Sequence, residues 1–97
     1  MQRVGGMTFI TVGTSSALLV PYSPNRRSIT FHPPANNRVT ISDESLAILD
    51  SGPTLQQMQA PLRYTKKDYG DLVYGPFFAI ANVAGVQVGI SESYDYK

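Results

Sequence analysis

The chain has 97 residues, with eight Lys and Arg against seven Asp and Glu, so its formal net charge is +1. A chain this short fits one domain and excludes a two-domain enzyme. The balanced charge gives no electrostatic footprint for nucleic acid. The absence of cysteine excludes disulfide frameworks, thiolate chemistry and cysteine-based zinc sites. Only 15% of the residues are charged, and permanent protein interfaces are also depleted of charge.

The sequence predicts neither a secretory signal nor a membrane span. Residues 1–7 carry one positive charge but lack the apolar core that a signal peptide needs. The longest uncharged apolar stretch, residues 75–90, is interrupted by Pro76, Asn82, Gln87 and glycines. It is also shorter than the ~18–20 apolar residues of a spanning helix. We therefore expect a soluble protein with no membrane partner.

The N-terminal part of the chain has the composition of short strands. Residues 8–12 are all β-branched or aromatic and end at Gly13. Residues 17–20 form a short apolar run that Pro21 closes. We expect a strand at each of these two segments.

Two alternating segments follow, residues 28–32 and 38–42, with polar and apolar side chains in turn. This period of two is typical of half-buried strands. Because a Pro- and Asn-rich turn separates the segments, we predict that they form a hairpin. Its inner face would carry Ile29, Phe31, Val39 and Ile41.

The middle of the chain gives weaker signals. Residues 45–49 fit a strand or one turn of helix, and residues 55–58 fit a short helix or an irregular crossing. Residues 61–65 are expected to be extended, and residues 66–71 form the one dense charge cluster. The excursion at residues 45–59 is a candidate for a protruding or swapped element.

Residues 77–81 and 86–90 are predicted to form a second hairpin through the Gly-containing loop 82–85. The near-continuous apolar run of its first arm indicates a strand covered on both faces. The whole pattern predicts six to eight short strands and no amphipathic helix. It is typical of a small antiparallel β-sandwich or barrel. We expect one β domain over residues 1–97, with an N-terminal arm at 1–7 and a C-terminal tail at 93–97.

No constellation of residues indicates catalysis. His32 is the only histidine and lies at the end of a predicted strand, where a surface imidazole is the simpler interpretation. The acid pairs Asp43-Glu44 and Asp68/Asp71 fall in polar turns and are interpreted as solvated. No nucleophile elbow, phosphate loop, dinucleotide fingerprint or zinc-protease motif occurs. We predict a protein that is not an enzyme, with no catalytic residue, metal ligand or cofactor.

Nucleic-acid binding has thin support. The basic pairs at 26–27 and 66–67 are short, although Tyr64 and Tyr69 flank the second pair as a stacking platform for single strands would. The two aspartates that follow at once cancel the local field. A small single-stranded nucleic-acid-binding barrel is kept as an alternative from a different class.

The tyrosines are the better candidates for contacts. Six of the ten aromatic residues are Tyr, which suits half-buried positions at protein interfaces. Four of them fall in predicted loops or near the C-terminus, where a core role is harder to arrange. These candidate interface residues are Tyr69, Tyr74, Tyr94 and Tyr96. The alternative is that they cap the ends of the fold.

A structural turn is predicted before residue 28. Asn25 can close an Asx-turn after Pro24. Arg26 can bridge backbone carbonyls or a carboxylate of a neighbouring strand. These roles would be structural rather than chemical.

Short motifs along residues 8–93 together resemble one family. A Leu-Leu-Val-Pro step and an Asn-Arg pair precede an alternating strand, and an aromatic-Ala-Ile-Ala strand precedes a final Val-x-Val strand that ends in Glu. These motifs are Leu18-Leu19-Val20-Pro21, Asn25-Arg26, Phe78-Ala79-Ile80-Ala81, and Val86-Gln87-Val88 with Glu92. The chain thereby resembles small β-rich virion proteins of tailed bacteriophages. Residues 45–59 have no counterpart in the pattern, and the tail after Glu92 runs past its usual end.

The resemblance implies a non-enzymatic structural protein that decorates or cements the capsid shell. Its expected partners are the major capsid protein or other virion proteins, bridged after the shell expands. A homo-oligomer, dimer or trimer, is expected because closed symmetry is the common solution. The expected location is the virion, after synthesis in the host cytoplasm. A tail, collar or host-surface-binding component is the alternative within the same family.

Overall fold

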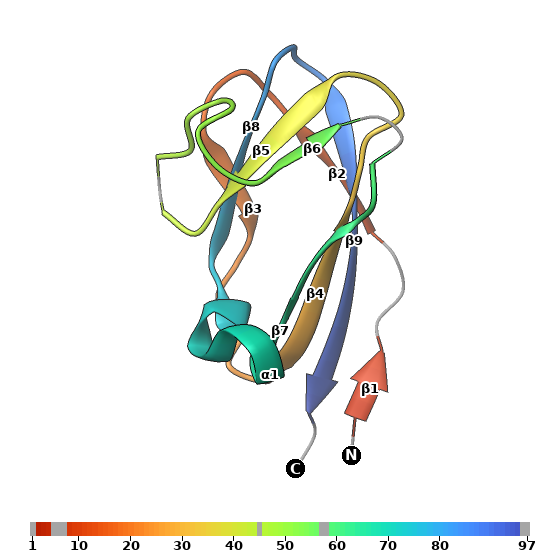
Figure 1. Ribbon diagram of the computed structural model, residues 1–97, viewed down its shortest axis with the longest axis vertical. Helices are drawn as coiled ribbons and strands as arrows, with labels where there is room; N and C mark the ends of the chain where they lie inside the picture. Colours follow the sequence, from red (N-terminus) through yellow and green to blue (C-terminus); the bar gives the residue numbers. More distant parts are fainter. Residues whose placement is uncertain (1, 5–7, 45, 57–58, 96–97) are drawn as a thin grey trace.

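The protein folds as two antiparallel β-sheets packed face to face (Figure 1). The computed structural model describes residues 2–4, 8–44, 46–56 and 59–95. Because each sheet has its own edges, the fold is a sandwich rather than a closed barrel. The predicted all-β class is confirmed.

The first sheet has the order β1-β9-β4-β7, and β2 also pairs with β9. Its strands are β1 (Gln2–Val4), β2 (Thr8–Val12), β4 (Arg26–His32), β7 (Leu62–Thr65) and β9 (Val86–Asp95). β1 pairs with residues 93–95 and β2 with residues 86–90, so they lie one after the other along β9. Parts of the predicted arm and tail thus pair with each other.

The second sheet has the order β3-β8-β5-β6. Its strands are β3 (Ala17–Val20), β5 (Arg38–Ser42), β6 (Thr54–Gln56) and β8 (Phe77–Ala81). The bounds predicted for residues 8–12, 17–20, 38–42 and 77–81 agree with the structure. Residues 54–56 are extended rather than helical, whereas residues 57–58 lie outside the described residues.

Both predicted hairpins are wrong. β4 lies in the first sheet between β9 and β7, whereas β5 lies in the second sheet between β8 and β6. β8 and β9 are likewise in different sheets. Alternation reveals which side chains turn inward but not which strand lies alongside, and both short connections cross from one sheet to the other. The second face of β8 is also less covered than predicted, since alternate residues are only half-buried.

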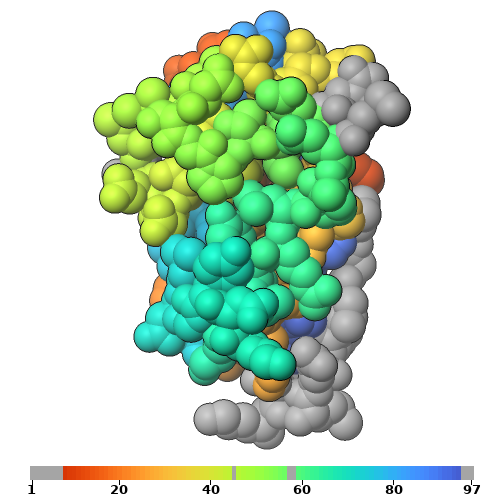
Figure 2. Space-filling view, in the orientation of Figure 1, coloured from red at the N-terminus to blue at the C-terminus, as the bar shows by residue number. Residues whose placement is uncertain are grey.

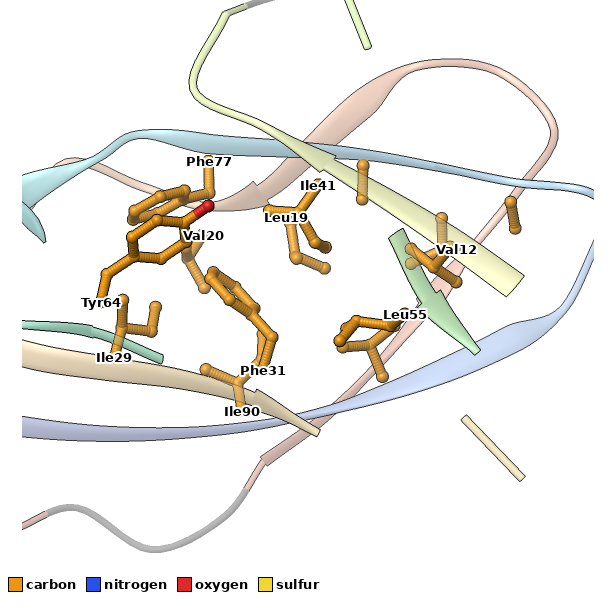
Figure 3. Packing of buried hydrophobic residues seen from close by; sticks show 14 of the residues in the cluster. Val12, Leu19, Val20, Ile29, Phe31, Ile41, Leu55, Tyr64, Phe77 and Ile90 are labelled. Atoms are coloured by element: carbon orange, nitrogen blue, oxygen red, sulfur yellow. The ribbon is translucent and has the colours of Figure 1, made fainter. Parts of the chain in front are cut away.

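The predicted inward-facing residues do form the core, because β4 and β5 belong to the two sheets that pack on each other and their side chains share one buried cluster. Ile29, Phe31, Val39 and Ile41 are all fully buried. Figure 3 shows the aromatic part of this core, where the Phe77 ring lies 5.1 Å from Phe31 and 5.4 Å from Tyr64 between centroids. Burying such a side chain contributes about 1.5–3 kcal/mol, so this layer stabilises the sandwich substantially.

The charge cluster at residues 66–71 forms helical turns and not the polar loop that was expected. α1 (Lys66–Tyr69) is followed by a 3₁₀ helix, η1 (Gly70–Tyr74). Thr65 is extended as the last residue of β7, and its hydroxyl accepts a hydrogen bond from the Asp68 N–H (3.1 Å). This N-cap starts the helix directly from the strand. Residues 46–53, in contrast, are bends and turns with neither helix nor strand.

Candidate docking site

The loop between β5 and β6, described at residues 43–44 and 46–53, is fixed to the rest of the fold near its centre. The Ala47 N–H donates to the Ser16 hydroxyl (2.8 Å), and the Asp50 N–H donates to Thr40 Oγ1 (2.8 Å). Ser16 immediately precedes β3, and Thr40 belongs to β5. The loop therefore has a fixed position on the surface of the sandwich.

A surface ion pair adds to this attachment. Arg38 Nε donates to both carboxylate oxygens of Asp50, at 2.8 and 3.1 Å. The hydrogen bond to Asp50 and its negative charge raise the pKa of Arg38. Because both side chains are well exposed, water and salt screen their attraction, and the pair adds little to stability.

The loop holds two apolar side chains out in solvent. Ala47 is buried with 2% of its surface exposed, whereas Leu46 is 69% and Ile48 is 57% exposed. The hydrogen bond of Ala47 fixes this alternation, so the outward direction of its neighbours is imposed by the fold. Adjacent large apolar side chains that a protein holds in water mark a surface for contacts with other molecules.

A cleft of about 330 Å³ lies beside the exposed pair. Its apolar floor includes Tyr64, Leu72 and Phe77, and Asp43 and Glu44 line its acidic side. β6 pairs with residues 38–40 of β5, and beyond them the Ile41 N–H donates to the Pro53 carbonyl (2.8 Å), so the chain on either side of this contact lines the cleft. In Figure 2 the loop, in yellow-green, lies above the helical turns, in cyan, on the same face of the molecule.

Tyr64 is the polar group on the floor of the cleft. Its side chain comes from β7 and is only 8% exposed, and its ring also contacts that of Tyr69, 4.8 Å away between centroids. Burial, the neighbouring Tyr69 and the charge of Asp43 raise the pKa of Tyr64. No described residue gives its hydroxyl a hydrogen bond, and no buried side-chain oxygen or nitrogen lacks a partner in the described residues. The hydroxyl therefore reaches solvent, and the cleft that Tyr64 lines is the opening.

The tyrosines predicted as contacts fall into different environments. Tyr69 lies at the end of α1 and is 49% exposed, beside the cleft through its contact with Tyr64. Tyr94 is half-buried on β9, opposite Arg26 in the register. Tyr96 lies outside the described residues.

Tyr74 is half-buried and already has partners. Its ring makes an edge contact with Tyr22 at 6.2 Å, and Lys66 Nζ lies 5.0 Å from the ring centroid. Lys66 also hydrogen-bonds the Tyr74 hydroxyl. Tyr74 thus joins η1 to α1 and to the segment before β4.

Arg26 is buried, with 2% of its surface exposed, and has acceptors of both predicted kinds. Its Nε donates to Glu92 Oε2 on the neighbouring strand β9 (2.7 Å). Its other nitrogens donate to the carbonyls of Val73 (3.2 Å), Tyr74 (3.0 Å) and Pro21 (3.1 Å). These bonds connect η1 and the loop before β4 to the first sheet.

A break in the strand register turns Arg26 inward. Alternation from the buried Ile29 would place Arg27 in the core, yet Arg27 is exposed. The pairing of β4 with β9 shifts between Arg26 and Ser28, as at a β-bulge, and this exchanges the two arginines. Asn25 is exposed at the preceding turn, which the Arg26 N–H closes on the Ser23 carbonyl (3.3 Å).

His32 lies at the end of β4, where its Nε2 is 3.0 Å from the Ser91 hydroxyl. The described residues contain no cluster of three or more His, Cys, Asp or Glu placed to hold a metal ion. Within the same residues, no helix has the length and apolar character needed to span a membrane.

No protein-family model, curated protein or solved structure matches this chain. The candidate site is therefore defined by geometry alone. Sequence reasoning did not single out Leu46 and Ile48, although one signal was present. Both belong to a short apolar run, residues 46–49, that lies between the acidic residues 43–44 and Asp50.

Proposed function

We propose that the chain is a structural protein of a bacteriophage virion that decorates or cements the capsid shell without enzymatic activity. One observation supports docking as its role: the anchored loop holds Leu46 and Ile48 in solvent beside a cleft with an apolar floor. The choice of the major capsid protein or another virion protein as partner rests on the family resemblance of residues 8–93.

The energetics of the loop suit such docking. Covering one Leu or Ile side chain contributes about 1.5–3 kcal/mol. Because the loop is already fixed, little ordering entropy opposes binding. A dimer or trimer on a repetitive shell would engage several copies at once, and avidity would then turn modest contacts into stable occupancy.

The aromatic side chains support shell binding over recognition of a host-surface glycan. Stacking on a sugar needs an exposed ring face, but the rings on the floor of the cleft, Tyr64 and Phe77, are buried. The exposed rings of Phe9, Tyr22 and Tyr69 belong to separate elements of the fold.

Three of the cations, including one from each basic pair, already have partners within the fold. Arg26 is buried on its own acceptors, Arg38 is paired with Asp50, and Lys66 is bonded to Tyr74. A single-strand groove would instead need cations that face the bound backbone.

The test is co-sedimentation with expanded heads that lack the protein, combined with light scattering of the free protein. A dimer or trimer that sediments with the heads is the expected result. The variant L46S/I48S should lose this occupancy, whereas V83S should keep it, because Val83 is an exposed apolar residue on the turn after β8 and does not line the cleft. A monomer that leaves the heads bare would overturn the proposal.

A further inference from the structure

The acidic side of the cleft has no compensating cation among the described residues. Asp43 and Glu44 are both exposed, and neither takes part in an ion pair there. This differs from Asp50, on the same loop, which is paired with Arg38. Two free carboxylates at one mouth create a negative potential that a cation from outside would relieve.

Two basic residues close to Tyr64 in the sequence do not fill this role. Arg63 is next to Tyr64 on β7, and because side chains alternate along a strand it belongs to the opposite face of the sheet. Lys66 is bonded to Tyr74. The cleft therefore combines an apolar floor, an acidic mouth and a free hydroxyl.

These three features select one kind of ligand group. A long aliphatic stem can pack on Leu72 and Phe77, while a cationic head pairs with carboxylates at the rim. Tyr64 as a residue is more than nine-tenths buried, and its hydroxyl has no partner in the described residues, so it can accept a hydrogen bond from that head. Arginine and lysine side chains have this construction.

The position of β7 favours an extended peptide segment as the part of the partner that bears the cationic side chain. Among the described strands β7 is the last of its sheet and pairs only with β4, so its other edge has no strand partner there and could accept an added strand. A strand added there would turn every second side chain toward the face that carries Tyr64.

We propose that the cleft binds an Arg or Lys side chain carried by an extended segment of a partner protein. The inference rests on the docking site of the proposed function and adds the chemistry of the partner. Binding of a peptide is measurable without any virion, so the two proposals can fail independently.

The experiment is an amide NMR titration of the full chain with two capped hexapeptides. The first is Val-Thr-Val-Arg-Val-Thr, and the second has norleucine in place of arginine. We expect the arginine peptide to shift amides of residues 43–52 and 62–65 with a Kd on the order of 1 mM or tighter. The norleucine peptide should bind at least about tenfold more weakly, because it lacks the ion pairs.

Matched variants separate the cleft from general charge effects. D43N/E44Q should weaken the arginine peptide about tenfold, whereas D68N/D71N, with the same charge change on the helical turns, should leave its Kd unchanged. Equal binding of both peptides would overturn the cationic specificity, and no shift in the cleft with either peptide would overturn the site. If the protein binds heads but not the peptide, the proposed function stands and the cleft proposal fails. If it binds the peptide but not the heads, the cleft proposal stands and the proposed function fails.

Discussion

Arg26 and Tyr64 are two buried residues with polar side chains that differ in their hydrogen bonding within the fold. The Arg26 guanidinium has four acceptors, three carbonyls and the Glu92 carboxylate. The Tyr64 hydroxyl has no partner among the described residues and reaches solvent through the cleft. An unsatisfied polar group normally costs about 1–3 kcal/mol when it is fully buried. The cleft therefore spares Tyr64 that cost and leaves the hydroxyl available to a ligand.

The contrast separates structure from function within one small domain. Removing the Arg26 network should break the fold, because a carboxylate and three carbonyls would lose their donors. Changes around Tyr64 should leave the fold intact and alter binding. The predictions below test this division, from the largest expected effect on stability to the smallest.

Substitution R26M should produce the largest loss. Removing one partner of a buried ion pair costs about 3–5 kcal/mol, since the other partner is left uncompensated. Urea unfolding followed by circular dichroism would measure the free energy of unfolding. The neighbouring exposed Arg27 offers a matched control, and R27M should cost no more than about 1 kcal/mol. An R26M variant as stable as R27M would refute the structural role of the network.

Substitution G75A should come next, because the backbone at Gly75 approaches the same guanidinium closely. Gly75 has φ +75° and ψ −158°, a conformation essentially restricted to glycine. An added Cβ would lie 3.1 Å from Arg26 Nη1 and 3.2 Å from the Phe77 ring. We expect a loss of about 1–3 kcal/mol in thermal or urea unfolding. G13A is the control, since a Cβ on Gly13 meets no atom within 4 Å, and it should change stability by less than about 1 kcal/mol.

Removing the hydroxyl of Thr40 and that of Tyr64, in separate variants, compares a bonded hydroxyl with one that has no partner. Thr40 is buried, and its hydroxyl accepts from the Asp50 N–H and bonds the Thr54 hydroxyl (2.9 Å), so T40V should cost about 1–3 kcal/mol. Y64F removes a hydroxyl without a partner and should cost less than about 0.5 kcal/mol at pH 7. A Y64F loss as large as that of T40V would show that the Tyr64 hydroxyl stabilises the fold.

The smallest effect is a pH dependence near the alkaline limit. Because the pKa of Tyr64 is raised in the fold, the unfolded chain releases this proton first as the pH increases. The resulting stabilisation is complete below the ordinary tyrosine pKa of about 10 and is lost as the pH rises from there through the raised value. Urea midpoints between pH 8 and 11 should therefore fall more steeply for the wild type than for Y64F. Identical slopes would contradict the raised pKa.

The sequence predicted well what depends on neighbouring residues. The alternation at residues 28–32 and 38–42 identified four core side chains, and breakers such as Gly13 and Pro21 marked the ends of strands. The two kinds of acceptor predicted for Arg26, backbone carbonyls and a carboxylate of a neighbouring strand, are also present. Arg26 was not expected to be buried, because the bulge that turns it inward depends on its pairing with β9.

The features that it missed depend on residues far apart in the chain. Strand partners were wrong because alternation is the same whether the next strand lies alongside or across the core. The cleft combines the loop after β5 with Tyr64 and Phe77, and no spacing in the sequence indicates that juxtaposition. In the sequence, Leu46 and Ile48 are part of an ordinary short apolar run. Only the structure, in which the Ala47 N–H bonds Ser16, shows that these two side chains point outward.

The central place of β9 has a consequence for how the protein folds. β1, β2 and β4 all pair with this one strand, and β2 is separated from it by more than half of the chain. The first sheet therefore cannot form from its N-terminal strands alone, and each closing contact spans a long loop. Folds dominated by such non-local pairings typically fold over milliseconds to seconds. We expect one slow, all-or-none transition, with no stable half-sandwich before β9 is in place.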